Sequence, residues 1–297
     1  MNFIDLFAGI GGFHSALHNL GQRCVFASEI NKYARLTYEH NYKEISPELF
    51  AQNHFNDDIL KITDICNEIP DFDILCAGFP CQPFSQAGYK KGFNEDKDER
   101  GNMFFHICRI IEAKRPKAFF LENVRHILKH DDGKTFEIIR KKLEEELNYT
   151  FHYKVIKASD YGLPQHRPRV FMIGFDKSQH KELPPFHFPD PIPLQFNMSS
   201  VFDGKCSREI GFTLRVGGKG SGLHDRRNWD AYLVDGNERR LTSEEGKKMM
   251  GLPDDFYFPV SESQAMKQLG NSVAVDAVKM TAEKLLQYLD TNTGYFN

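Results

Sequence analysis

Cys81 is the side chain best placed to do chemistry, because two prolines hold it directly after an apolar run. Residues 73–77 (DILCA) lead into the segment GFPCQPFS at residues 78–85. Proline cannot continue a sheet ladder or a helix interior, and it pushes the preceding residue toward extended geometry. We therefore expect Cys81 on a stiff loop past a strand end, where ligands bind in an open α/β sheet. The alternative is a buried thiol that packs as a small hydrophobic side chain.

Glu29 stands where a carboxylate could bind the ribose of a nucleoside cofactor. An apolar run at residues 2–7 precedes the turn AGIGG, a helical run at residues 13–20 and a second apolar run that ends at Glu29. A strand, a glycine turn, a helix and an acid about 20 residues further on form such a ribose site. The glycines do not follow the dinucleotide order GxGxxG, which favours a cofactor with an adenosine and a small charged tail. The alternative is a tight turn without a ligand.

Two further acids and two arginines are candidates for the same sheet edge. Asp58 could accept a hydrogen bond from an adenine amine, or it could cap a helix that begins at residue 59. Glu122 directly follows the apolar run 118–121, which predicts a position at the ligand edge or a hydrogen-bonding role in a loop. Arg167 and Arg169 stand one residue apart in an extended segment, so we expect both on one strongly cationic face.

Alternating strand and helix patterns predict an α/β fold up to residue 175. Helical spacing of apolar residues covers 103–111 and 136–147, and strands are predicted at 118–121, 151–156 and 170–175. Residues 183–196 contain five prolines, so we expect neither helix nor central strand there and place a domain boundary or hinge in that segment. Helices are predicted again at 242–250 and 275–289, the second after the segment GNSV.

Residues 203–248 form a donor-rich segment loosened by glycines. They hold ten Lys or Arg against eight Asp or Glu. Arginine and asparagine are side chains that contact base edges and phosphates in nucleic-acid complexes. The alternative is an irregular polar loop. The polar and aromatic residues that suggest a binding surface are Thr213, Arg215, Lys219, His224, Arg226, Arg227, Asn228 and Trp229.

The composition predicts a soluble, cytoplasmic protein of 297 residues without a membrane segment. Because the formal net charge is -3, any nucleic acid must bind at a local patch of basic residues. The six cysteines include no CxxC pair, which gives no indication of a zinc site and favours a reduced compartment. No metal and no obligate protein partner are expected.

Seven segments, taken in order, resemble the motif series of the 5-methylcytosine DNA methyltransferases. They span residues 5–275 in the order usual for that family, and the PCQ segment followed by ENV is the most specific part. The sequence has Asn56-Asp57 where the family often has a glycine before the acid, so both Asp57 and Asp58 are candidates for the adenine contact. The segments are DLFAGIGGF, the acid at Glu29, Asp58-Ile59, GFPCQPFS, ENV, QHRPR and GNSV.

The resemblance implies methyl transfer from S-adenosylmethionine to carbon 5 of a flipped-out cytosine in double-stranded DNA. The catalytic residues would be Cys81 as nucleophile, Glu122 at ring nitrogen 3, Arg169 at the ring oxygen and Arg167 beside it. The cofactor would be held by Phe7, Gly9, Gly11, Gly12, Glu29, Asp58, Ile59, Pro80, Asn271 and Ser272. Ser85 and Arg100 match phosphate contacts of the family, on a loop at 85–101 that could close over DNA. The other DNA contacts are expected from Gln165, Thr213, Arg215, Arg226, Arg227 and Asn228.

The resemblance also implies a domain division and a biological context. Residues 1–176 would form the catalytic domain, with a doubly wound, mostly parallel sheet of the S-adenosylmethionine-dependent methyltransferase type. Residues 177–260 would form a smaller, irregular target-recognition domain, and residues 261–297 a C-terminal helix that returns to the catalytic domain. We expect a bacterial restriction-modification role, since no regulatory extension is evident. A tRNA cytosine-5 methyltransferase is the nearest alternative, ahead of a nucleotide-binding oxidoreductase or an inert nucleic-acid binder.

Overall fold

A seven-stranded sheet forms the centre of the computed structural model, which describes residues 1–80, 103–178, 183–217 and 220–296. The strand order is β3-β2-β1-β4-β5-β7-β6. Five neighbouring strands run parallel, and β7 runs antiparallel to both β5 and β6. The strands are β1 (Asn2–Leu6), β2 (Arg23–Ser28), β3 (Phe55–Asn56), β4 (Ile74–Gly78), β5 (Ala118–Val124), β6 (His152–Lys157) and β7 (Pro168–Phe175).

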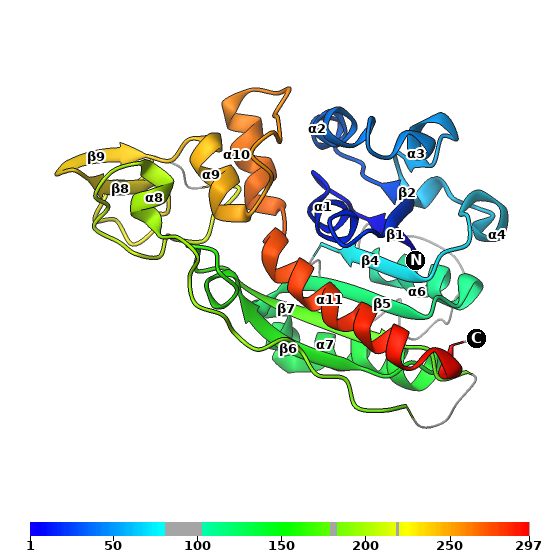
Figure 1. The fold of residues 1–297 in the computed structure, drawn as a ribbon. Helices are drawn as coiled ribbons and strands as arrows, with labels where there is room; N and C mark the ends of the chain where they lie inside the picture. Colours follow the sequence, from blue (N-terminus) through cyan, green and yellow to red (C-terminus); the bar gives the residue numbers. More distant parts are fainter. Residues whose placement is uncertain (81–102, 179–182, 218–219, 297) are drawn as a thin grey trace.

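Helices cover both faces of this sheet, because its strands are apolar on both sides. Adjacent residues of one strand, such as Phe119 and Phe120 in β5, belong to two different buried clusters, one on each face. This confirms the predicted doubly wound α/β fold (Figure 1). The helices of this part are α1 (Gly12–His18), α2 (Lys32–Tyr42), α3 (Pro47–Ala51), α4 (Ile65–Glu68), α6 (Met103–Lys114), α7 (Lys134–Lys141) with a π-helical turn at Lys142–Glu146, and α11 (Val275–Thr291).

A smaller lobe lies to one side of the sheet, at the left of Figure 1. It contains α8 (Met198–Phe202), the hairpin of β8 (Ala231–Val234) and β9 (Asn237–Arg240), α9 (Ser243–Met250) and α10 (Glu262–Asn271). Thr242 caps α9 in a capping box with Glu245, and Gly251 ends the helix at φ 70°, as the sequence predicts. The domain boundary expected at residue 260 falls just before α10, which packs against α9, whereas α11 packs against α1.

The proline-rich segment is packed along the sheet edge. Its backbone carbonyls accept hydrogen bonds from buried tyrosines, Tyr161 Oη to Pro189 at 2.8 Å and Tyr288 Oη to Pro184 at 2.6 Å. It contains neither helix nor strand over residues 183–196, as its prolines predict. The segment connects the sheet to the small lobe as an extended strap beside β6 (Figure 1).

Two predicted elements differ in their bounds. The strand expected at 118–121 continues to Val124, because β7 pairs with it as far as Arg169. Glu122 therefore lies within a strand rather than after one. The helix expected at 136–147 is divided between α7 and the π-helical turn. In the described part of the chain, no helix combines the length and the apolar character needed to cross a membrane.

Candidate active site

A cavity of about 1470 Å³ opens at the carboxyl ends of the parallel strands. Its walls come from segments that follow β1, β2, β3 and β4, from the end of β5, from the start of β7 and from α10. Parallel strands bring their carboxyl ends to one edge, which is why segments far apart in the sequence meet there. Of the residues expected to bind a cofactor, Phe7, Gly9, Glu29, Asp58, Ile59, Pro80 and Asn271 line this cavity.

Glu29 is fixed at the cavity wall by two backbone amides. Its Oε2 accepts a hydrogen bond from the amide of Gly9 at 2.8 Å, and its Oε1 accepts one from Asn31 at 2.7 Å. Burial raises the pKa of this carboxyl, against a smaller lowering by these amides. Each oxygen keeps a further lone pair that could accept from a ligand hydroxyl. The geometry therefore suits the ribose contact that the spacing predicts.

The glycine turn contributes one lining residue, Gly9, and two packed ones. Gly11 has φ 81°, and a Cβ on it would overlap the ring of Tyr42, whose hydroxyl donates to the Gly11 carbonyl at 2.7 Å. A Cβ on Gly12 would come within 2.5 Å of Val273. Gly11 and Gly12 are absent from the cavity lining, and their contact with the cofactor stays a prediction. They are needed for close packing of the turn.

The structure distinguishes between the two candidate acids after β3. Asp58 lines the cavity, and its Oδ1 accepts the amide of Leu60 at 3.0 Å as the cap of a short 3₁₀ helix, Ile59–Lys61. Asp57 is absent from the cavity lining and pairs with Lys61 at 2.9 Å. The structure confirms Asp58 as a helix cap through one carboxylate oxygen. Its contact with an adenine amine through the other oxygen stays a prediction.

The segment GNSV supplies Asn271 to the cavity, but Ser272 is turned away. The Ser272 side chain is buried, and its hydroxyl donates weakly to the carbonyl of Val273 at 3.4 Å. Neither residue caps α11, whose N-cap is Ala274 without a side-chain bond. Ser272 is absent from the cavity lining, and its expected contact with the cofactor stays a prediction.

Glu122 and Arg169 form the charged centre of the cavity. Arg169 Nε lies 2.9 Å from Glu122 Oε1, and both residues line the cavity. Burial raises the pKa of the Glu122 carboxyl, and the charges of Arg169 and Arg167 oppose that shift in part. The carboxyl therefore holds a proton to higher pH than an exposed glutamate does. Such a group can donate to a ring nitrogen while the guanidinium binds a neighbouring oxygen.

Arg167 has a different environment from Arg169. Its side chain is buried, absent from the cavity lining, and donates to the carbonyls of Leu214 at 3.2 Å, Gly270 at 2.9 Å and Ser272. Burial lowers its pKa to about 9, with a further contribution from Arg169. Arg167 precedes β7, which begins at Pro168, but its charge acts on Glu122 together with that of Arg169. The shared cationic face and a catalytic role for Arg167 stay predictions. Arg167 joins the small lobe and the segment before α11 to the sheet.

Asn123 is a site residue that the sequence reasoning did not assign. It is buried, and its Nδ2 donates to the carbonyl of Phe79 at 2.9 Å. This bond ties the end of β5 to the segment that leads into Cys81. Its place in the ENV segment is the signal that could have identified it. Cys81, Ser85 and Arg100, with the loop expected at 85–101, lie outside the described residues.

Two residues expected to contact DNA are internal. Gln165 is fully buried, with Nε2 donating to Met249 at 3.0 Å and Oε1 accepting from Leu214 at 3.2 Å. Asn228 is buried and donates to Leu223 at 3.1 Å and Ala231 at 2.9 Å. Both predictions of direct DNA contact are therefore wrong, because these amides satisfy backbone groups of the small lobe.

Four other residues expected to contact DNA retain accessible surface. Arg215, Arg226 and Arg227 are exposed, and Arg227 pairs with Asp225 at 2.7 Å. Thr213 is partly exposed, and its hydroxyl donates to the carbonyl of His166. These residues lie between α8 and the β8–β9 hairpin in the sequence.

Comparison with known proteins identifies the family. The chain matches the family described as C-5 cytosine-specific DNA methylase over residues 1–212 and 205–287. It is 39% identical to the type II methyltransferase M.SsoII of Shigella sonnei, over 97% of this chain and 80% of that protein. It is 38% identical to M.HhaI of Haemophilus parahaemolyticus, over 99% of this chain and 94% of that protein.

Solved structures share the fold at lower sequence identity. A mutant DNMT2 of Spodoptera frugiperda has a TM-score of 0.70 at 18% identity, covering 96% of this chain and 99% of that one. Dnmt2 of S. pombe has a TM-score of 0.69 at 16% identity, covering 98% of both chains. With the family match across both the sheet and the small lobe, these findings show that the chain belongs to the C-5 cytosine-specific DNA methylases.

Proposed function

We propose that this DNA cytosine-5 methyltransferase acts through a covalent Cys81 adduct, with Glu122 and Arg169 holding the target base. The observation that carries the proposal is the ion pair of Glu122 and Arg169 inside the cavity, 2.9 Å apart. It places a carboxyl group whose pKa is raised by burial beside a cation. The Watson–Crick edge of cytosine presents a ring nitrogen next to a carbonyl oxygen, which is the complementary arrangement.

The cavity fits S-adenosylmethionine as the methyl donor. Glu29 would bind the ribose hydroxyls, Asp58 the adenine amine, and Ile30, whose side chain is 72% exposed at the cavity, the flat face of the adenine. Phe7, Gly9 and Asn271 would complete the walls. When bound, the cofactor supplies an electrophilic methyl group on a sulfonium. The fit rests on acceptors at two separate walls of a cavity large enough for a nucleoside.

The assigned residues account for the chemistry at cytosine. Carbon 5 is a weak nucleophile until the Cys81 thiolate adds to carbon 6, which forms the S–C6 bond. The electron pair of the 5,6 double bond then forms a 4,5 double bond, and that of the 3,4 double bond moves to nitrogen 3, which makes carbon 5 an enamine carbon. Glu122 would donate its proton to nitrogen 3 as charge develops there, and Arg169 would hold the ring oxygen. After methylation, a base removes the carbon 5 proton, the 5,6 double bond re-forms, and the S–C6 bond breaks to release the Cys81 thiolate. Nitrogen 3 returns its proton to Glu122 as the 3,4 double bond re-forms.

The DNA substrate must present the base outside the helix, since carbon 6 cannot be reached within a duplex. Arg215, Arg226, Arg227 and Thr213 would contact the DNA from the small lobe, while Ser85 and Arg100 would contact phosphates. Relatives named as type II methyltransferases support a role in restriction-modification, with action in the cytoplasm on host DNA.

Mechanism-based trapping tests this function. We expect a duplex with 5-fluorocytosine at the target to form a covalent adduct with the wild type, because fluorine at carbon 5 cannot leave as a proton does. Cys81→Ser should form none. An adduct that survives this substitution would remove the nucleophile assignment. Parallel assays of methyl transfer to duplex DNA and to tRNA should give activity on DNA alone.

A further inference from the structure

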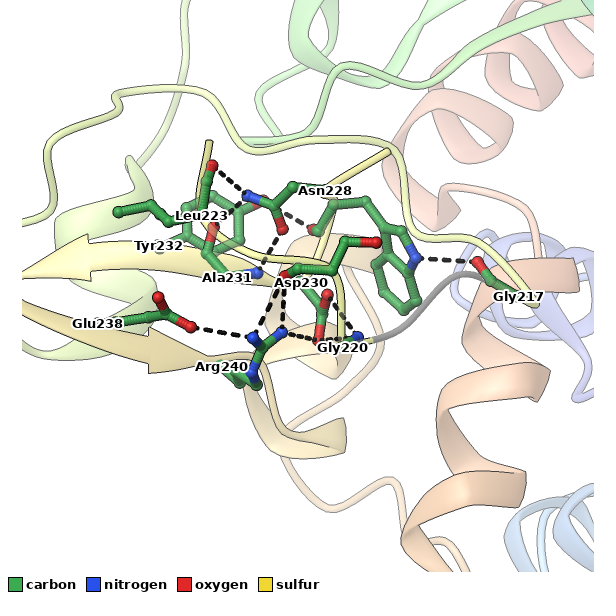
Figure 2. A network of polar contacts seen from close by, with 11 residues as sticks. Gly217, Gly220, Leu223, Asn228, Asp230, Ala231, Tyr232, Glu238 and Arg240 are labelled. Atoms are coloured by element: carbon green, nitrogen blue, oxygen red, sulfur yellow. Dashed lines mark hydrogen bonds and ion pairs between the residues drawn. The ribbon is translucent and has the colours of Figure 1, made fainter. Parts of the chain in front are cut away.

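An ion pair between a buried aspartate and a partly exposed arginine of the small lobe holds the backbone of a surface segment. Asp230 is fully buried, and its Oδ2 lies 3.1 Å from Nη1 of Arg240 on β9. Both carboxylate oxygens of Asp230 also accept the backbone amide of Gly220 at 3.3 Å. The guanidinium of Arg240 donates to the carbonyl of Ser221 at 3.2 Å and to Glu238 at 2.9 Å (Figure 2). The pair therefore acts on the segment through main-chain groups.

Two neighbouring side chains hold the same segment at either end. Trp229 Nε1 donates to the carbonyl of Gly217 at 2.9 Å, and Asn228 Nδ2 donates to that of Leu223 at 3.1 Å (Figure 2). We call residues 215–217 and 220–227 the recognition loop. Its backbone is held at four positions, three of them by buried side chains and one by the partly exposed Arg240, while Arg215, His224 and Arg226 remain exposed.

The recognition loop begins at the wall of the active-site cavity. Val216 lines the same cavity as Glu122 and Arg169. A Cβ on Gly270 would come within 2.6 Å of the Arg215 backbone, so the start of the loop lies directly on α10 next to Asn271. If the target base enters the cavity, the duplex it leaves must lie beside this loop.

We infer that Asp230 and Arg240 are positioning residues that set the DNA sequence specificity of the enzyme. This inference rests on the proposed function. Base edges are distinguished only by donors and acceptors held in hydrogen-bonding geometry, whereas phosphate attraction tolerates displacement. The pair holds the backbone at Gly220 and Ser221, between Arg215 and Arg226 in the recognition loop. Its loss should therefore reduce discrimination between sequences more than it reduces general DNA attraction or cofactor binding.

The decisive variant is the double substitution Asp230→Asn with Arg240→Gln, which removes both charges together and leaves no unpaired buried ion. The wild-type target is first identified by bisulfite sequencing. kcat/KM is then measured on that duplex and on duplexes with one altered base pair. The specificity ratio is kcat/KM on the target duplex divided by kcat/KM on an altered duplex. We expect this ratio to fall about tenfold or more, which is the discrimination that one base pair usually provides. Calorimetric S-adenosylmethionine affinity and kcat at saturating target DNA should stay within about twofold.

Arg239→Gln is the matched control. Arg239 lies on the same strand and pairs with Glu245 at 2.8 Å, but its other bond goes to the carbonyl of Phe202 on α8. Its loss removes a comparable ion pair without touching the recognition loop, and the ratio should remain that of the wild type. An unchanged ratio in the double variant, or an equal loss in Arg239→Gln, would overturn the inference.

Arg240→Lys tests the pair without removing its charge, and it decides the matter if the double variant does not fold. Lysine cannot donate in the same fork to Asp230 and Ser221, so the ratio should fall by an intermediate amount. The inference is contradicted if Arg240→Lys keeps the wild-type ratio and the double variant does not fold. It is also contradicted if Arg240→Lys keeps that ratio and the double variant folds and is as specific as the wild type. A wild type that methylates all cytosines alike would instead overturn the proposed recognition of a specific sequence, and this inference with it.

Discussion

Glu122 Oε1 and Arg169 Nε lie 2.9 Å apart on neighbouring antiparallel strands, β5 and β7. The strand register pairs Arg169 with Val124, two residues beyond Glu122, so the two side chains meet diagonally on one face. Burial raises the pKa of Glu122 and the arginine opposes it. The pairing of β5 with β7 therefore holds the two side chains together. Substitutions at Glu122 and at Arg169 can test each residue separately.

Glu122→Gln should lower kcat by about 10²–10³, because glutamine cannot transfer a proton to nitrogen 3. The S-adenosylmethionine affinity should change little, since Glu29 and Asp58 define the proposed nucleoside end of the cavity. Single-turnover rates and calorimetric titration measure the two effects. Glu137→Gln, at an exposed acid that pairs with Arg140 on α7, is the control. Equal losses of rate and cofactor affinity would remove the catalytic role of Glu122.

Asp58→Asn should weaken S-adenosylmethionine binding about tenfold, the usual effect of losing a hydrogen bond to a charged group. Asparagine can keep the oxygen that caps Leu60, so the 3₁₀ helix should remain intact. Asp57→Asn removes a neighbouring charge that pairs with Lys61 outside the cavity, and its affinity should match the wild type. Isothermal titration with S-adenosylmethionine measures the affinity of both variants. A larger loss of affinity in Asp57→Asn than in Asp58→Asn would assign the adenine contact to Asp57.

Arg167→Lys and Arg169→Lys should have opposite consequences. A lysine at 167 cannot reach all three carbonyls, and each one left unpaired costs about 1–3 kcal/mol of unfolding free energy. Arg169→Lys keeps a charge beside Glu122, so its stability should change by less than about 1 kcal/mol while kcat falls. Urea denaturation and steady-state kinetics separate the two effects. If the Arg167→Lys enzyme is as stable as the wild type but inactive, Arg167 has a catalytic role.

Asp5→Asn should change the pH dependence of stability. Asp5 is fully buried, and burial raises its pKa well above the ordinary value, against a smaller effect of the His14 backbone amide. A raised folded-state pKa contributes stability below the unfolded pKa, about 4, and this contribution is lost as the pH rises toward the folded pKa. The stability of the wild type relative to Asp5→Asn should therefore fall from pH 4 upward. Urea unfolding across that range measures the difference, and a constant difference would contradict it.

The sheet and much of the cavity could be predicted from the sequence because their signals are local. Apolar runs mark the strands, a glycine turn follows β1, and Glu29 and Asp58 come at or just after strand ends. Parallel strands place such residues at one edge without further information. The capping box and terminal glycine of α9 are equally local signals.

The positions that the sequence does not predict are those of polar side chains whose partners are distant in the sequence. Gln165 bonds Met249 and Leu214, and Arg167 bonds Gly270, so their burial depends on how the small lobe docks. A polar residue in a basic segment looks the same in sequence whether it faces DNA or a backbone carbonyl. The extension of β5 through Glu122 likewise depends on its pairing with β7.

The return of the chain from the small lobe to the sheet has a consequence for biosynthesis. Asn271 and other residues of α10 form part of the cavity wall, and α11 then packs against α1 near the start of the chain. A growing polypeptide can build the strands early, but it lacks this wall until α10 (Glu262–Asn271) has been translated. A prematurely terminated product would therefore carry the Cys81 segment without a complete cofactor cavity, so unfinished chains should not methylate DNA.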